Sequence, residues 1–289
     1  MSNLLHNTSS LVLLGLLLIL TIASIIKLST GKRIFTGSYV YYIWILLLIL
    51  VIGDLFPFRA ATWGFGILSF YVLREYFSLV DLRAQDRLGI LASYFSIPFM
   101  MHFVHADWYN MFIITIPVYS FLLIPFLISI TGKETEGAIY SIGTIDFGLF
   151  LFVYCIGHLA YLAFFSIWMA AMLVLNIFIC DLVCFFIEKR TFTFWKKLLL
   201  KYFITVPFTC LLTYVLSDWT TIPLLHSIIL GLMIPAIVLI GNHTIQYFYT
   251  DLGIMKEKMK PGRGMIIDNI KSILYAAPVV LHYIRYFIF

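Results

Sequence analysis

The sequence predicts an all-α, polytopic integral membrane protein of about ten transmembrane helices, and two observations carry this prediction. Of the 289 residues, 62% are hydrophobic and only 11% are charged, which is more apolar surface than a water-soluble globule can bury. The apolar residues also form continuous runs such as Leu11–Leu20 and Ile43–Val51, whereas a membrane β-barrel would show short alternating strands. The fold therefore depends on helices in a bilayer.

Ten segments are candidate spans, because crossing the hydrocarbon takes roughly 17–25 mostly apolar residues. In chain order they cover residues 9–27, 38–53, 60–80, 88–105, 110–131, 145–165, 168–187, 199–216, 223–241 and 270–288. The second is short and the third has polar ends, so nine or eleven spans are also compatible. No Lys or Arg precedes the first segment and no cleavage site follows it, so we expect a retained helix rather than a signal peptide.

The basic residues fall on alternate loops. If the N-terminus lies outside, all 19 Lys and Arg except Arg59 and Arg285 lie on the cytoplasmic side or flank it. The positive-inside rule then predicts an N-out, C-out topology. Orientation and anionic headgroups already account for the net charge of +5, so we expect membrane lipids, and no nucleic acid, as partners.

We divide the chain into N-terminal transmembrane helices (1–140) and a C-terminal transmembrane domain (141–289) that carries a long polar loop, 242–269. Within that loop Gly262 and Gly264 predict a tight turn that opens the last helix, with Asp268 in its first turn. Such a turn offers free backbone N–H groups to an oxyanion. The candidate phosphate-binding residues are Lys256, Lys258, Lys260, Gly262, Arg263 and Gly264. The alternative is that these basic residues serve only orientation and lipid contact.

Acids inside apolar helices are informative, since a charge at the bilayer centre costs at least about 2.5 kcal/mol. Asp181 is the clearest, and Glu188 lies seven residues further along the same helical face. Asp181 could hold a divalent cation, or it could form an interhelical hydrogen bond, for instance to Thr205, Thr209 or Asn176. The basic stretch Lys189–Lys201 is either an interfacial segment or a phosphate contact.

From Gly241 onward the chain reads G-N-H-T-I-Q-Y-F-Y-T-D-L-G-I-M-K-E-K-M-K-P-G-R-G-M-I-I-D-N-I-K-S-I-L-Y-A-A-P. This resembles the signature of the phosphatidate cytidylyltransferases (CDP-diacylglycerol synthases), approximately G-D…S-x-x-K-R-x-x-G-I-K-D…I-P-G-H-G-G-x-x-D-R-x-D-S. The matching residues are Gly241, Gly253, Ile254, Pro261, Gly262, Gly264, Asp268 and Ser272. Cys180-Asp181 with Glu188-Lys189, and Arg74-Glu75-Tyr76-Phe77, resemble two upstream family elements. The resemblance covers roughly the last 120 residues.

The resemblance implies a reaction of CTP with phosphatidate, or a related lipid phosphate, that yields CDP-diacylglycerol and pyrophosphate in phospholipid biosynthesis. It implies catalytic roles for Asp268 and Asp181, and Mg²⁺ held by Asp181, Asp268 and Asn242. It also favours a bacterial inner membrane and is compatible with a homo-oligomer.

Several signature positions depart from the family. The acid of G-D is Asn242, the K-R pair is Tyr249-Thr250, G-H-G-G reads Gly262-Arg263-Gly264-Met265, and D-R-x-D reads Asp268-Asn269-Ile270-Lys271. A second hypothesis is therefore a catalytically inactive relative that binds a lipid phosphate or partners another membrane protein. A third, an unrelated transporter, would place Asp146 and Asp181 in a transport pathway.

Overall fold

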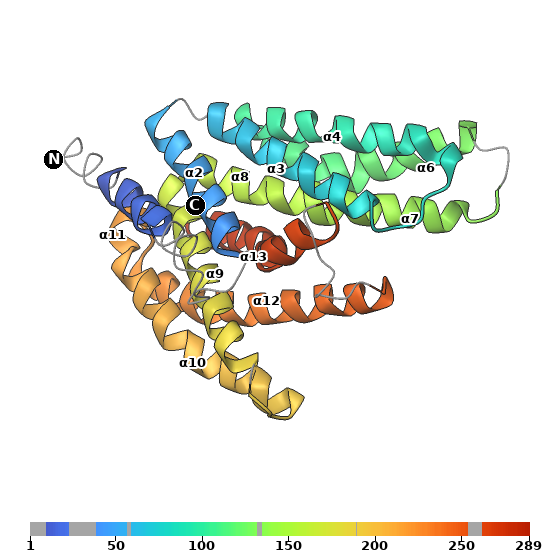
Figure 1. The fold of residues 1–289 in the computed structure, drawn as a ribbon. Helices are drawn as coiled ribbons and strands as arrows, with labels where there is room; N and C mark the ends of the chain where they lie inside the picture. The colour runs from blue at the N-terminus through green and yellow to red at the C-terminus, as the bar shows by residue number, and fades with distance from the viewer. Residues whose placement is uncertain (1–9, 23–38, 57–58, 132–134, 189, 254–261) are drawn as a thin grey trace.

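In the computed structural model every regular element is a helix (Figure 1), so the all-α prediction is confirmed for the residues that the structure describes. These are residues 10–22, 39–56, 59–131, 135–188, 190–253 and 262–289. After a first helix, Ser10–Ile22, the elements are α2 (Tyr39–Leu55), α3 (Arg59–Phe77), η1 (Ala84–Asp86), α4 (Arg87–His105), α5 (Tyr109–Ile114), η2 (Thr115–Ser120), α6 (Phe121–Thr131), α7 (Ala138–Leu149), η3 (Phe150–Tyr154), α8 (Cys155–Phe165), α9 (Ile167–Glu188), α10 (Phe194–Val215), α11 (Ser217–Thr220), α12 (Leu224–Asp251) and α13 (Met265–Phe287).

Seven helical stretches within the described residues are long and apolar enough to cross a membrane. They are Ala84–His105, Tyr109–Ile130, Ala138–Phe165, Ile167–Glu188, Phe194–Val215, Leu224–Asp251 and Met265–Phe287. The predicted spans 9–27 and 38–53 contain shorter apolar helices, Ser10–Ile22 and Tyr42–Leu55, and α3 is not among the seven. The chain is thus a multi-pass helical membrane protein, while the count of ten and the N-out, C-out orientation stay predictions.

The connection between the last two spans is shorter than the predicted loop 242–269, because α12 continues to Asp251 and α13 begins at Met265. A helix of 28 residues such as α12 is about 42 Å long at 1.5 Å per residue, whereas the hydrocarbon core is about 30 Å thick. The polar run from Asn242 onward therefore continues α12 beyond the apolar layer instead of leaving the helix.

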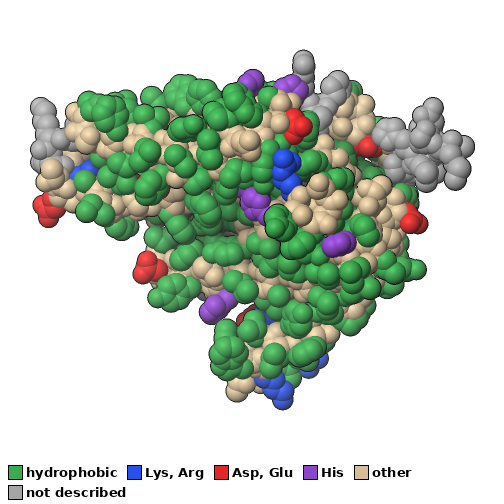
Figure 2. Space-filling model, turned by 180° about the vertical axis from the view of Figure 1, so that it is seen from behind, with side chains coloured by type: hydrophobic (Ala, Val, Ile, Leu, Met, Phe, Trp, Pro, Cys, Tyr) green, Lys and Arg blue, Asp and Glu red, His purple; other side chains and the backbone are tan. Residues whose placement is uncertain are grey.

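Helix α13 lies at the centre of the fold and packs against α8, α9, α12 and α3. Pro235 in α12 and Pro278 in α13 lie inside the helices, as membrane helices tolerate when neighbouring helices satisfy the freed backbone groups. Hydrophobic side chains cover most of the face seen in Figure 2. A surface of this kind suits contact with lipid rather than with water.

The turn between α3 and α4 is fixed by a buried ion pair. The guanidinium of Arg83 donates to Asp86 Oδ1 (2.7 Å) and Oδ2 (2.9 Å), and it also donates to the backbone oxygen of Glu136 (2.6 Å). Asp86 is fully buried. The pair therefore ties this turn to the connection before α7.

We expect Asp86→Ala to destabilise the protein by about 2 kcal/mol, because removing one partner leaves the Arg83 charge uncompensated. Thermal unfolding of the detergent-solubilised protein measures this effect. Asp81→Ala, at an exposed position of the same turn, is the matched control and should change the unfolding temperature little. Equal effects of the two variants would contradict the assigned role of the pair.

Candidate functional site: a polar cavity between four helices

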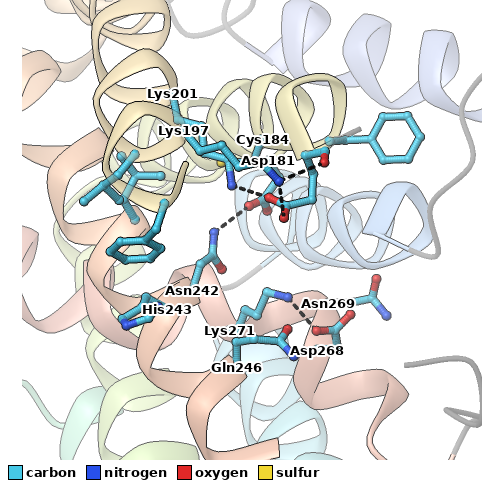
Figure 3. A pocket seen from close by; sticks show the side chains of 15 residues that line it. Asp181, Cys184, Lys197, Lys201, Asn242, His243, Gln246, Asp268, Asn269 and Lys271 are labelled. Carbon is cyan, nitrogen blue, oxygen red and sulfur yellow. Dashed lines mark hydrogen bonds and ion pairs between the residues drawn. The ribbon is translucent and has the colours of Figure 1, made fainter. Parts of the chain in front are cut away.

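A cavity of about 630 Å³ lies between the end of α9, the start of α10, the later turns of α12 and the start of α13 (Figure 3). It is lined by polar side chains from all four helices, including Asp181, Asn242 and Asp268. Asp181 thus shares one site with Asn242 and Asp268, which lie 61 and 87 positions further along the chain. Its volume lies within the range of about 300–1,000 Å³ typical of small-molecule sites.

Asp181 is the junction between three helices. Its Oδ1 accepts a hydrogen bond from the hydroxyl of Ser272 on α13 (2.7 Å) and one from the amide of Asn242 on α12 (3.4 Å). Ser272 Oγ also lies 3.0 Å from Asn242 Oδ1. The alternative of an interhelical hydrogen bond is thereby confirmed, but with other partners, since Thr205 and Asn176 donate to backbone oxygens of their own helices.

Asp268 lies in the first turn of α13, as predicted, and pairs with Lys271 one turn further on. The ammonium of Lys271 is 2.5 Å from Asp268 Oδ1. Lys271 and Asp268 also act electrostatically on Asp181, with opposite signs. The two predicted catalytic acids therefore lie in one electrostatic cluster, with a lysine beside them.

The opposite wall of the cavity carries two more lysines. Lys197 and Lys201 are four residues apart on α10, and Lys201 Nζ lies 2.5 Å, and Lys197 Nζ 3.6 Å, from the carboxylate of Glu188. The lysine side chains are 24% and 16% exposed, compared with 59% for Glu188, and both lysines line the cavity. Residues of the stretch Lys189–Lys201 thus line a site in the first turns of a helix.

The glycine turn before α13 exists as predicted, but its donors do not face the cavity. Gly262 and Gly264 have φ values of +79° and +87°, which only glycine adopts without strain. The backbone N–H of Ile267 donates to Glu75 Oε2 (2.9 Å). A buried side chain of α3 thus accepts from a backbone N–H group beside this turn, and phosphate binding at the turn stays a prediction.

Gly262, Arg263 and Gly264 are not among the described residues that line the cavity. The other predicted phosphate-binding residues, Lys256, Lys258 and Lys260, lie outside the part of the chain that the structure describes. Asp146 is also not part of this lining; it lies in α7 with its carboxylate oxygens buried and without a hydrogen-bond partner among the described residues.

The residues present do not fit the Mg²⁺ site that the resemblance implies. Within the described residues, no group of three or more His, Cys, Asp or Glu side chains is placed to hold a metal ion. Asp268 Oδ1 is paired with an ammonium, and Asp181 Oδ1 accepts two hydrogen bonds. A divalent cation bound to Asp268 Oδ1 would have to displace Lys271.

Comparison with known proteins leaves the family open. No family model matches the chain, and no solved structure matches it. The chain is 25% identical over 247 residues to the uncharacterized protein YnbB of Escherichia coli (strain K12), an alignment that covers 77% of this chain and 78% of that protein. The likeness thus extends over most of both chains.

Sequence reasoning placed Lys197 and Lys201 only within the basic stretch Lys189–Lys201, and it assigned no role to Glu75. The spacing of the two lysines did contain a signal, since residues four apart share a helix face. Glu75 was visible only as part of a short upstream match. Its contact with Ile267 joins positions 192 residues apart, which no local pattern reveals.

Proposed function

We propose that this protein is a cytidylyltransferase-like membrane protein that uses CTP and phosphatidate, or a related lipid phosphate, to form CDP-diacylglycerol and pyrophosphate. The observation that carries the proposal is the convergence of separate signature-like segments. Asp181, Asn242 and Ser272 come from three such segments and form one hydrogen-bonded cluster. Glu75, from a fourth, holds the segment that bears Asp268 and Ser272.

The cavity has the charges that this reaction needs. A phosphate oxygen of the lipid would attack the α-phosphorus of CTP, a new P–O bond would form, and the bond to the β-phosphate oxygen would break to release pyrophosphate. The lipid phosphate, the triphosphate of CTP and the released pyrophosphate are all anionic. Cations placed beside the charge that moves between them stabilise such a transfer. Lys197 and Lys201 on one wall and Lys271 on the other can supply this charge.

The lipid would enter sideways from the bilayer. On α10 the large side chains of Trp195, Leu199 and Phe203 are exposed, at 70%, 54% and 66%. In a membrane these side chains would face acyl chains, while Lys197 and Lys201 of the same helix line the cavity. A lipid phosphate lying along α10 can therefore reach the lysines without leaving the membrane interface.

The second candidate is a catalytically inactive relative that binds the lipid phosphate. One observation favours it: Lys271 stands where the family signature has an acid, and it is already paired with Asp268. Binding needs only the cations, whereas nucleotidyl transfer also needs the α-phosphate placed in line with the attacking oxygen.

The test is to incubate the purified full chain in detergent with phosphatidate, MgCl₂ and labelled CTP, and to measure CDP-lipid and pyrophosphate. We expect both products in wild type and a loss of about a hundredfold in Asp268→Ala, because Lys271 then loses the partner that positions it. Asp218→Ala, at an exposed position beyond the far end of α10, is the matched control.

The outcomes separate the candidates. Absence of product together with retained phosphatidate binding favours the second candidate. Absence of product together with no phosphatidate binding rejects both.

A further inference from the structure

The described lining of the cavity carries three acids and three lysines, so its charges balance without a bound cation. Asn242 donates its amide to Asp181 Oδ1 over 3.4 Å, so it stabilises the carboxylate as a neutral donor. A carboxylate at position 242 would instead place a second negative charge within about 4 Å of the first, and such pairs need a cation or a shared proton. The asparagine removes that requirement.

Lys271 adds a positive charge near the two acids, Asp181 and Asp268. Its ammonium is 2.5 Å from Asp268 Oδ1, and its side chain is only 16% exposed. The same charge acts on Asp181. A Mg²⁺ ion between the two acids would meet a fixed positive charge at short range, and it would lose the oxygen ligands that its octahedral shell demands.

We propose that the Lys271 ammonium takes the place of a divalent cation between Asp181 and Asp268, so that the cavity excludes Mg²⁺ and holds a phosphate group through lysines. An ammonium has three N–H donors, of which the bond to Asp268 uses one. Lys197 and Lys201 face it across the cavity as further phosphate donors. The phosphate part of this inference rests on the proposed function, whereas the exclusion of the metal does not.

Titration of the full chain in detergent with Mn²⁺, observed by electron paramagnetic resonance, tests the exclusion without any lipid or nucleotide. We expect no stoichiometric binding to wild type or to Lys271→Met, and stoichiometric binding to Lys271→Asp, which adds a carboxylate beside Asp181 and Asp268. Lys196→Asp makes the same charge change at an exposed position outside the cavity and should leave Mn²⁺ unbound. Stoichiometric binding to wild type, or none to a folded Lys271→Asp, overturns the proposal.

Binding of dioctanoyl phosphatidate tests the second part of the proposal, that lysines hold the phosphate group. Dioctanoylglycerol, which lacks the phosphate, is the control. Wild-type affinity should change by less than about twofold between MgCl₂ and EDTA. It should fall about tenfold or more in Lys271→Met, because a charge-assisted hydrogen bond contributes about 1.5–3 kcal/mol. Wild-type binding that needs Mg²⁺ overturns this inference and leaves the proposed function standing. No phosphatidate binding in either condition refutes the proposed function, and the Mn²⁺ titration still decides the exclusion.

Discussion

Glu75→Ala is expected to lower the stability of the protein by about 3 kcal/mol, since a buried N–H group left without an acceptor costs about 1–3 kcal/mol. The Glu75 side chain is almost fully buried, and it accepts from the backbone N–H of Ile267 and caps the start of α13. The midpoint of thermal unfolding in detergent should fall by roughly 10 °C. The same change should weaken phosphatidate binding, because the first turn of α13 carries Asp268.

The matched control is Glu75→Gln, which keeps the shape and one acceptor oxygen but removes the charge. We expect it to lose less than half as much stability as Glu75→Ala. A Glu75→Ala variant that unfolds at the wild-type temperature would show that Glu75 does not hold the glycine turn.

Gly231→Ala should destabilise the protein by about 3 kcal/mol, because it forces α10 and α12 apart. A Cβ at position 231 would lie 2.6 Å from Cys210 Cα and 2.9 Å from its backbone nitrogen, and backbone atoms cannot rotate away. The close approach also allows Thr209 Oγ to donate to the oxygen of Gly231 (2.7 Å). Thermal unfolding reports the loss of stability.

Function should fall with stability in this variant, because α10 carries Lys197 and Lys201 and α12 carries Asn242. Phosphatidate binding at a temperature where the variant remains folded measures the effect on the cavity. Gly143→Ala is the control, since nothing lies within 4 Å of the added methyl group and alanine favours a helix over glycine by about 1 kcal/mol. Equal stability losses in the two variants would contradict the packing argument.

Glu75 and Lys271 make contacts at the positions where the C-terminal signature implies phosphate and metal binding. Glu75 accepts a backbone N–H at the turn that could have bound a phosphate, and Lys271 pairs with Asp268, one of the two acids that could have bound a metal. We therefore propose that the lysines of α10 and α13 recognise the phosphate, inside the cavity rather than at the helix N-terminus.

The sequence by itself determined the fold class and the approximate positions of the helices. Long apolar runs leave no alternative to helices that satisfy their own backbone hydrogen bonds in lipid. It also determined that Asp181 and Asp268 are unusual, since charges within apolar segments are costly. The tight turn at Gly262 and Gly264 followed from glycine chemistry, which is local.

Only the tertiary structure decided which groups meet. The end of α12 could not be predicted, because a helix that leaves the apolar layer loses its hydropathy signal while its backbone hydrogen bonds continue to Asp251. The partners of the carboxylates could not be predicted either, since Glu75 meets Ile267, and Asp181 meets Ser272, across contacts that separate helix packing creates. Hydropathy and local propensity act over a few residues, whereas the charge balance of the cavity depends on four helices at once.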